Sequence, residues 1–154
     1  MKITLRDLNK KHACVSQRRL FKRMFGEEVI VTEALCSEHA LLFNWDWAAN
    51  QLLARPGQRA YHVTIYPARN AYCTAADLAQ DAYFETTKVA RDAYREAIKL
   101  KQTAYDDAAD TILAAAVKPA HDVYSKAVEL AQDAYSRVCA IAFFNASTIT
   151  AWKD

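Results

Sequence analysis

Glycine and proline are scarce in this sequence: two glycines and three prolines occur among 154 residues. Because these residues mark turns and interrupt helices, their scarcity argues against a turn-rich chain and favours helix. No uninterrupted apolar run approaches the ~18 residues that a bilayer-spanning helix needs. The basic N-terminus is also not followed by the apolar segment of a secretory signal. We therefore expect a cytoplasmic protein with no membrane segment.

Paired cysteine spacings and catalytic motifs are missing as well. The cysteines, Cys14, Cys36, Cys73 and Cys139, lie far apart, which is typical of buried free thiols in a reducing compartment. The sequence has no Gly-rich phosphate loop, no Gly-x-Ser-x-Gly elbow and no His-Glu-x-x-His. We therefore expect no enzymatic activity and no cofactor.

A zinc site is one alternative use of the thiols. Cys36 and His39 are three residues apart, on one side of an expected helix, and His12 and Cys14 would complete a Cys₂His₂ set. This spacing matches no familiar zinc finger, and a buried thiol at Cys36 fits the register of its helix. We therefore predict no metal site.

Positive charge is concentrated at the N-terminus. Residues 1–25 hold eight Lys or Arg against one Asp, a net charge of +7 in a chain whose total is +2. The rest of the chain is therefore acidic, and the two parts differ in character.

Tyrosine recurs at a fixed interval. Residues 61, 72, 83, 94 and 105 are tyrosines spaced by eleven, and so are residues 124 and 135. The six residues that end at each tyrosine are similar, and copies 78–83 and 130–135 are identical (Leu-Ala-Gln-Asp-Ala-Tyr). All three prolines occupy the first of these six positions. Eleven residues make three helical turns plus only ~20°, so equivalent positions stay on one helix face.

The repeat predicts an apolar stripe. Positions five, four and one before each tyrosine, and three after it, are mostly Ala, Leu or Val. Because alanine allows helices to approach closely, we expect this stripe to be the seam between two helices.

The tyrosine frame breaks between 105 and 124, where Lys118-Pro119 occurs. Proline is disfavoured inside a helix but suits its first turn, so we expect one helix over 67–117, a tight turn and a second helix over 119–144. Together they form an antiparallel hairpin, a hendecad coiled coil, with part of the first arm uncovered. Pairing within one chain and pairing between two chains remain alternatives. Residues 56–66 are predicted as a connector. The eleven-residue tyrosine repeat favours a short helix there, whereas the β-branched and aromatic residues favour a strand.

Residues 1–55 predict a small basic helical head, so the fold class is all-α. Thr4 and Asp7 resemble a capping box, Ser16, Thr32 and Asn44 suit the N-caps of three further helices, and Gly26 suits the end of the second. The expected core of this head consists of Phe43, Trp45, Trp47, Leu52 and Leu53.

The head and the repeats together resemble small proteins of bacteriophage and prophage genomes, over most of the chain. The resemblance rests on Cys14, Gln17, Phe21, Phe25-Gly26, Val29, Val31-Thr32, Phe43-Asn44-Trp45-Asp46-Trp47-Ala48-Ala49 and Leu52-Leu53, followed by Pro-Ala-…-Tyr repeats. Asn44 departs from the acidic residue usual in that family, and Asn70 stands where other repeats carry Asp. The resemblance implies a viral accessory protein in the host bacterial cytoplasm; it carries no activity and no site.

Two sets of residues are candidate binding sites. Arg18, Arg19, Lys22 and Arg23 form one basic helix face that suits nucleic acid, or else an ordinary solvated face. Tyr72, Tyr83, Tyr94 and Tyr105 follow one edge of the long helix every ~16 Å, where they either meet a protein partner or cover the alanine seam.

These observations lead to three hypotheses on function. The leading one is a non-catalytic viral accessory protein that binds a host or viral protein and inhibits a host process. The alternatives are a nucleic-acid-binding protein that uses the basic helices, and a structural coiled-coil protein that assembles with itself as a homodimer.

Overall fold

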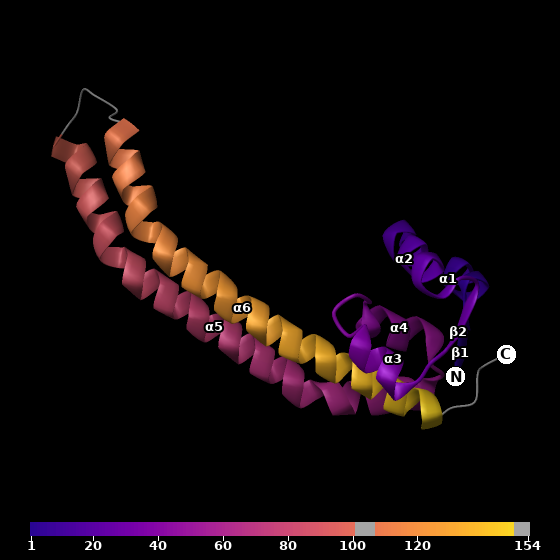
Figure 1. The fold of residues 1–154 in the computed structure, drawn as a ribbon. Coiled ribbons are helices and arrows are strands. Elements are labelled where there is room, and N and C mark those ends of the chain that lie inside the picture. Colours follow the sequence, from indigo (N-terminus) through magenta and orange to yellow (C-terminus); the bar gives the residue numbers. More distant parts are fainter. Residues whose placement is uncertain (101–106, 150–154) are drawn as a thin grey trace. The chain divides into compact units, whose positions relative to one another are not determined.

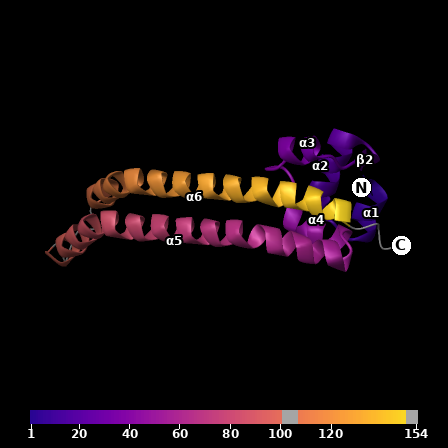
Figure 2. The ribbon, with the colours of Figure 1, turned by 90° about the horizontal axis from the view of Figure 1, so that it is seen from below.

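The structure is a computed structural model that describes the backbone of residues 1–100 and 107–149, and the side chains of residues 1–96, 111 and 113–149. Within these residues the chain is essentially all-α, as predicted, with six helices and one two-stranded sheet (Figure 1). The two long helices, α5 (Arg55–Leu100) and α6 (Asp107–Ile149), lie side by side and antiparallel in both ribbon views (Figures 1 and 2). The chain divides into a compact unit, residues 1–69 with 133–154, and a paired-helix unit, residues 70–132.

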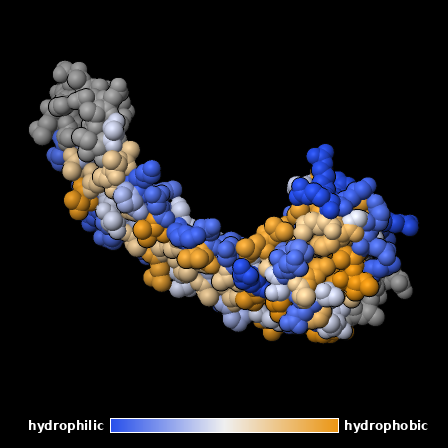
Figure 3. Space-filling model, in the orientation of Figure 1, coloured by the Kyte–Doolittle hydropathy of each residue, from blue (hydrophilic) through white to orange (hydrophobic). Residues whose placement is uncertain are grey.

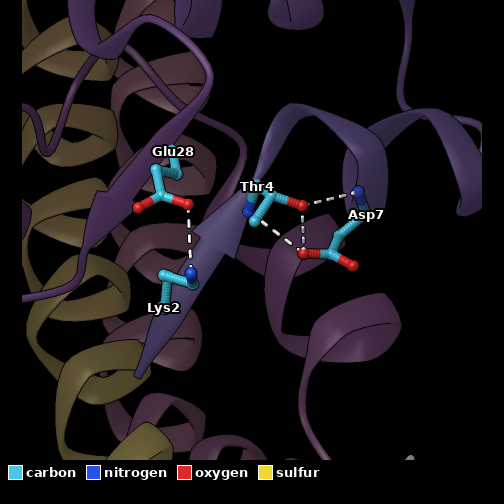
Figure 4. Close-up of polar contacts among 4 residues, drawn as sticks. All are labelled: Lys2, Thr4, Asp7 and Glu28. Atoms are coloured by element: carbon cyan, nitrogen blue, oxygen red, sulfur yellow. Dashed lines mark hydrogen bonds and ion pairs between the residues drawn. The ribbon is translucent and has the colours of Figure 1, made fainter.

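The compact unit begins with a small sheet that the sequence did not reveal. Strand β1 (Lys2–Thr4) pairs antiparallel with β2 (Glu28–Ile30). Lys2 Nζ lies 3.0 Å from Glu28 Oε2 across the pair. Helix α1 (Leu5–Lys10) follows at once, and the predicted capping box is confirmed: the Asp7 amide donates to Thr4 Oγ1 at 3.1 Å, and the Thr4 amide donates to Asp7 Oδ2 at 3.0 Å (Figure 4).

Three further short helices follow the predicted caps, with one exception. Helix α2 (Val15–Phe25) has Cys14 as its N-cap, so the prediction of Ser16 was wrong, while Gly26 ends this helix with a φ of 74°. Helix α3 (Glu33–Glu38) is capped by Thr32 as predicted. Helix α4 (Trp45–Leu52) is capped by Asn44, whose Oδ1 accepts from the Trp47 amide at 2.9 Å.

The core of the compact unit joins the short helices to the ends of both long helices. Of the predicted core residues, Trp45, Leu52 and Leu53 are buried, while Phe43 and Trp47 pack against the core half-buried. The long helices add residues that the prediction left out: Tyr61, Ile65, Cys139, Ala140, Ala142, Phe143 and Ala146. The compact unit therefore extends well beyond the predicted boundary at residue 55.

The predicted bounds of the long helices were wrong. Residues 56–66 form no separate connector but belong to α5, which begins at Arg55. The predicted tight turn at Lys118-Pro119 does not occur, because α6 begins at Asp107 and continues through Pro119. In the described residues α5 ends at Leu100 and α6 begins at Asp107.

Proline is tolerated inside both helices because it faces water. Pro67 and Pro119 each remove one backbone hydrogen bond, to the carbonyl of the residue four positions earlier. Those residues are Val63 and Ala115, and both are exposed. Water can therefore bond to the freed carbonyls, while contacts on the opposite helix face keep both helices continuous.

The seam of the paired-helix unit contains the tyrosines themselves. On α6 the half-buried positions include Val117, Ala120, Tyr124, Val128 and Ala131, spaced by three or four residues. On α5 they include Tyr72, Ala76, Ala79, Tyr83, Ala90 and Tyr94, with Thr87 fully buried. The seam thus uses each tyrosine and the positions four before and four after it. The predicted seam shared the position four before each tyrosine and, at Ala75, the position three after Tyr72. Most of its other positions are exposed, so it was largely wrong.

Candidate interaction surface

The other positions of the predicted seam form an exposed apolar stripe. We call it the outer stripe: Leu78, Ala82, Val89 and Ala93 on α5, and Val123, Ala127 and Leu130 on α6, all of them exposed. The four large side chains are 64% (Leu78), 78% (Val89), 71% (Val123) and 58% (Leu130) exposed. In Figure 3, hydrophobic residues accordingly interrupt the hydrophilic surface along the two long helices. Single exposed apolar residues are ordinary, but a regular row of them indicates a contact surface.

Both halves of the outer stripe lie on the same face of the helix pair. The two helices share one repeat, so in each of them the stripe lies on the same side of the tyrosines when the helix is viewed along its axis from the N-terminus. Because the helices are antiparallel, a two-fold axis perpendicular to the plane that contains both helix axes relates their equivalent positions. Such an axis leaves each face of that plane unchanged, so the two halves of the stripe lie on the same face. The result is an apolar surface over two helices, interrupted on α5 by the exposed Thr86 and suited to a third helix.

Acidic residues border the α5 half of the outer stripe. The next positions around that helix are Asp81, Glu85, Asp92 and Glu96, all exposed. Arg95 Nη1 lies 3.1 Å from Asp92 Oδ1, so one of these charges is partly compensated within the chain. The corresponding α6 positions alternate in sign, with Asp122 followed by Lys126. The surface is therefore apolar at its centre and acidic along one edge.

The candidate tyrosines face the seam and contribute to packing within the chain. Tyr72, Tyr83 and Tyr94 are half-buried, and Tyr105 lies outside the described side chains. The ring centroids of Tyr83 and Tyr124 are 5.8 Å apart across the seam. Arg91 places its guanidinium 5.5 Å from the Tyr83 centroid and donates from Nη2 to the Tyr83 hydroxyl at 3.3 Å. The rings thus cover the seam, one of the two uses that the sequence allows.

Two tyrosines of the same frame converge on one carboxylate in the compact unit. Asp46, from α4, accepts from the Tyr61 hydroxyl at 2.9 Å through Oδ1 and from the Tyr135 hydroxyl at 3.0 Å through Oδ2. Burial, reinforced by neighbouring Cys139 and Asp46, raises the pKa of both phenols well above the usual range. Asp46 therefore ties α4 to both long helices.

The Trp-Asp-Trp-Ala-Ala segment around Asp46 has a structural role throughout. The Trp45 indole is buried, donates to the Ala40 carbonyl at 2.9 Å and packs 5.4 Å from the Phe143 ring. Ala48 and Ala49 are also buried, and their small side chains allow close packing. Trp45, Ala48 and Ala49 of this segment thus belong to the core.

The basic face of α2 is partly used within the compact unit. Arg18 is half-buried and donates from Nη1 to Asn9 Oδ1 at 2.6 Å. Lys22 Nζ lies 3.4 Å from Glu27 Oε1. Arg19 and Arg23 are exposed. Lys22 is exposed as well, so three of the four candidate cations lie on the surface, while Arg18 and Lys22 are engaged within the compact unit.

The cysteines are free thiols in two environments. Cys36 and Cys139 are buried as predicted, whereas Cys14 and Cys73 are exposed, which corrects the expectation for those two. Burial raises the pKa of the Cys36 thiol to about 12. Within the described part of the chain, no three or more His, Cys, Asp or Glu gather in a way that could hold a metal ion, so His12, Cys14, Cys36 and His39 form no zinc set.

Comparisons with known proteins supply no relative. No protein-family model matches the chain, and comparison with curated proteins and with solved structures yields no match. Over residues 1–100 and 107–149, neither the long helices nor the short ones combine the length and apolar character needed to cross a bilayer.

One signal in the sequence could have identified the outer stripe. All three prolines occupy the position that Leu78, Val89 and Leu130 hold in other copies of the repeat. Proline leaves a carbonyl without its helical partner, and that carbonyl needs water. A position that accepts proline three times is therefore expected to face solvent rather than the seam.

Proposed function

We propose that the protein is a non-catalytic viral accessory protein that binds a helix of a host or viral protein through the outer stripe, and that this binding inhibits a host process. The observation that carries the proposal is the regular exposure of Leu78, Val89, Val123 and Leu130 on one face. Each such side chain contributes up to about 1.5–3 kcal/mol when it is fully buried, which favours contact between this face and an apolar partner.

The charges around the stripe define the partner. Asp81, Glu85, Asp92 and Glu96 border its α5 edge. A partner helix with an apolar face and Lys or Arg along the facing edge gains complementary charge there, which favours the correct orientation and speeds association. The expected partner is therefore a basic amphipathic helix docked lengthwise on α5 and α6.

A binding titration with defined peptides tests this proposal. A labelled amphipathic helical peptide with a Leu/Val face and Lys edges is titrated with the wild-type protein and with the double variant Leu78→Ser and Val89→Ser. The matched control is Asp77→Ser with Lys88→Ser, which alters two exposed residues at the same spacing and keeps the net charge. We expect the stripe variant to bind at least about tenfold more weakly, a difference of about 1.4 kcal/mol, and the control to bind like wild type.

A peptide with Glu edges provides the charge control and should bind more weakly than the Lys-edged peptide. Equal binding of the Lys-edged peptide to all three proteins contradicts the proposed surface. Turnover of a nucleotide or ester substrate by the purified protein contradicts the non-catalytic assignment.

Solution mass by light scattering separates the alternatives. The proposal expects a monomer at low and at high salt. A dimer that the Leu78→Ser and Val89→Ser substitutions dissociate would instead assign the stripe to a second copy and support self-assembly. A salt-sensitive complex with duplex DNA that Arg19→Glu with Arg23→Glu abolishes would support nucleic-acid binding in its place.

A further inference from the structure

The compact unit contains a cavity that the packing of its core leaves open. Its volume is about 430 Å³, and aromatic side chains from α2 and from the α4 region form much of its wall. The rings of Phe25 and Phe43 are stacked at 5.8 Å between centroids, and Phe43 meets Trp45 at 6.0 Å. Volumes of roughly 300–1,000 Å³ with mainly apolar walls are typical of sites for small molecules.

Burial separates the floor of the cavity from its rim. Floor residues such as Phe21, Trp45 and Leu52 are buried, whereas His12 and Cys14 on the rim are exposed. The cavity therefore opens to solvent beside the start of α2, where His12 has a φ of 57°.

The lining defines the chemistry of the ligand. No Asp, Glu, Lys or Arg lines the cavity, so a charged ligand would lose its hydration without gaining a counter-charge. The polar groups at the rim are few and partly engaged: Asn44 caps α4, and Ser16 Oγ lies 3.2 Å from Cys14 Sγ. We propose that this cavity binds an uncharged, mainly aromatic small molecule. This inference stands apart from the proposed function, because the outer stripe belongs to other residues.

Two exposed thiols in one chain provide a reporter and its control. Cys14 lies on the cavity rim, whereas Cys73 is exposed on α5 in the paired-helix unit. The hydrogen bond with Ser16 and those with nearby backbone groups lower the pKa of Cys14, so its thiolate is accessible to alkylating reagents. A bound ligand should shield Cys14 and leave Cys73 unaffected.

The test measures alkylation of the full-length reduced protein by iodoacetamide, with and without 1-aminoanthracene as an uncharged aromatic probe. Mass spectrometry of proteolytic peptides gives a separate rate for each thiol. We expect a saturating concentration of the probe to lower the alkylation rate of Cys14 by at least about fivefold and to leave the alkylation rate of Cys73 unchanged. Unchanged rates at both thiols, or equal slowing of both, would overturn the proposal.

Fluorescence locates the probe without relying on alkylation. Trp45 and Trp47 line the cavity, so bound probe should quench tryptophan emission. Trp47→Phe should reduce that quenching, because it removes one of the two indole rings of the lining. Cys73→Ser, an exposed position on α5 that does not line the cavity, should bind the probe like wild type. Ala48→Phe, which fills the cavity, should abolish binding if its circular dichroism matches wild type. Binding without tryptophan quenching places the probe elsewhere and contradicts the assignment.

Discussion

The two units use the same repeat in different ways. In the compact unit, Tyr61 is completely buried, whereas Tyr83, its equivalent in the paired-helix unit, is half-buried beside water. Every buried hydrophobic residue of the described chain belongs to the compact unit, and Thr87 is the one buried residue among the described side chains of the paired-helix unit. The repeat therefore sets the faces of the helices, and the residues that cover each face determine whether it becomes a core.

This contrast has an energetic meaning. A core that excludes water gains from apolar burial and makes each lost atom costly, whereas a two-helix seam with half-buried rings gains little per residue. Substitutions at equivalent positions should therefore have unequal effects in the two units. The following predictions run from the largest expected effect to the smallest.

Removal of the Phe143 ring should destabilise the protein most. This ring is completely buried and contacts Trp45, so Phe143→Ala leaves a large void and should lower the free energy of unfolding by about 3–5 kcal/mol. Urea unfolding followed by tryptophan fluorescence measures this loss. The control is Phe84→Ala in the paired-helix unit, where the ring is 47% exposed; an equal loss in both variants would contradict the contrast between the units.

Removal of the Asp46 carboxylate should cause the second-largest loss in the free energy of unfolding. Asp46→Ala deletes the acceptor of two phenol hydrogen bonds, and we expect a loss of about 3 kcal/mol in urea unfolding. Asp46→Asn keeps one acceptor oxygen and should cost less. The control is Asp92→Ala, which removes only an exposed ion pair and should change the free energy of unfolding by less than about 1 kcal/mol. Similar losses for Asp46→Ala and Asp92→Ala would exclude a structural role for the bridge.

Alkaline pH should weaken the compact unit. Folding raises the pKa of the Tyr61 and Tyr135 phenols above the ordinary tyrosine value of 10.0. It also raises the pKa of the Cys36 thiol from the ordinary value of 9.0 to about 12. The folded protein therefore binds more protons than the unfolded chain in this range, so stability is fully present below about pH 9 and falls as the pH rises. Each group contributes at most about 1.4 kcal/mol per pH unit. Urea midpoints from pH 8 upward measure the slope, and Tyr135→Phe should make it shallower above pH 10; an unchanged slope contradicts this origin.

The Tyr83 ring should contribute modestly to the seam. Tyr83→Ala removes its contact with Tyr124, and we expect local destabilisation of about 1 kcal/mol. Amide hydrogen exchange of residues 70–96 and 113–132 reports this change directly. Tyr61→Ala, at the equivalent position of the compact unit, should cost at least twice as much, and the reverse order would contradict the comparison.

Leu78→Ser should have the smallest effect on stability. The side chain is 64% exposed, so its loss should change the free energy of unfolding by less than about 0.5 kcal/mol in urea titration. A destabilisation above about 2 kcal/mol would place Leu78 in the folded core and remove it from the outer stripe.

Local rules in the sequence predicted much of the fold. The Thr4–Asp7 capping box, the Thr32 and Asn44 caps and the end of α2 at Gly26 depend on neighbouring residues only, and all are present. The eleven-residue period likewise predicted two long helices. Ser16 failed as a cap because helix α2 starts earlier, at Val15.

Features that depend on distant residues were not predictable in the same way. Pro119 breaks a helix by local rules, yet seam contacts with α5 outweigh that penalty here. The pairing of β1 with β2 requires residues 2–4 to meet residues 28–30. The phenol pair on Asp46 joins three helices, and neither the spacing nor the composition of the sequence indicates it. The outer stripe could be identified only after the seam was located.

The hydrogen bond between Tyr135 and Asp46 joins residues that lie 89 positions apart in the sequence. Ribosomal synthesis delivers α4 and the start of α5 long before Tyr135 and Phe143, so the core closes only when α6 returns. Closing a longer loop costs little more, since each doubling of its length adds only about 0.6 kcal/mol. The contacts of the core therefore leave the number of intervening repeats free, and one eleven-residue unit can be added to both helices or removed from both without altering them. The length of the helix pair can therefore change in evolution without a change in the stability of the core.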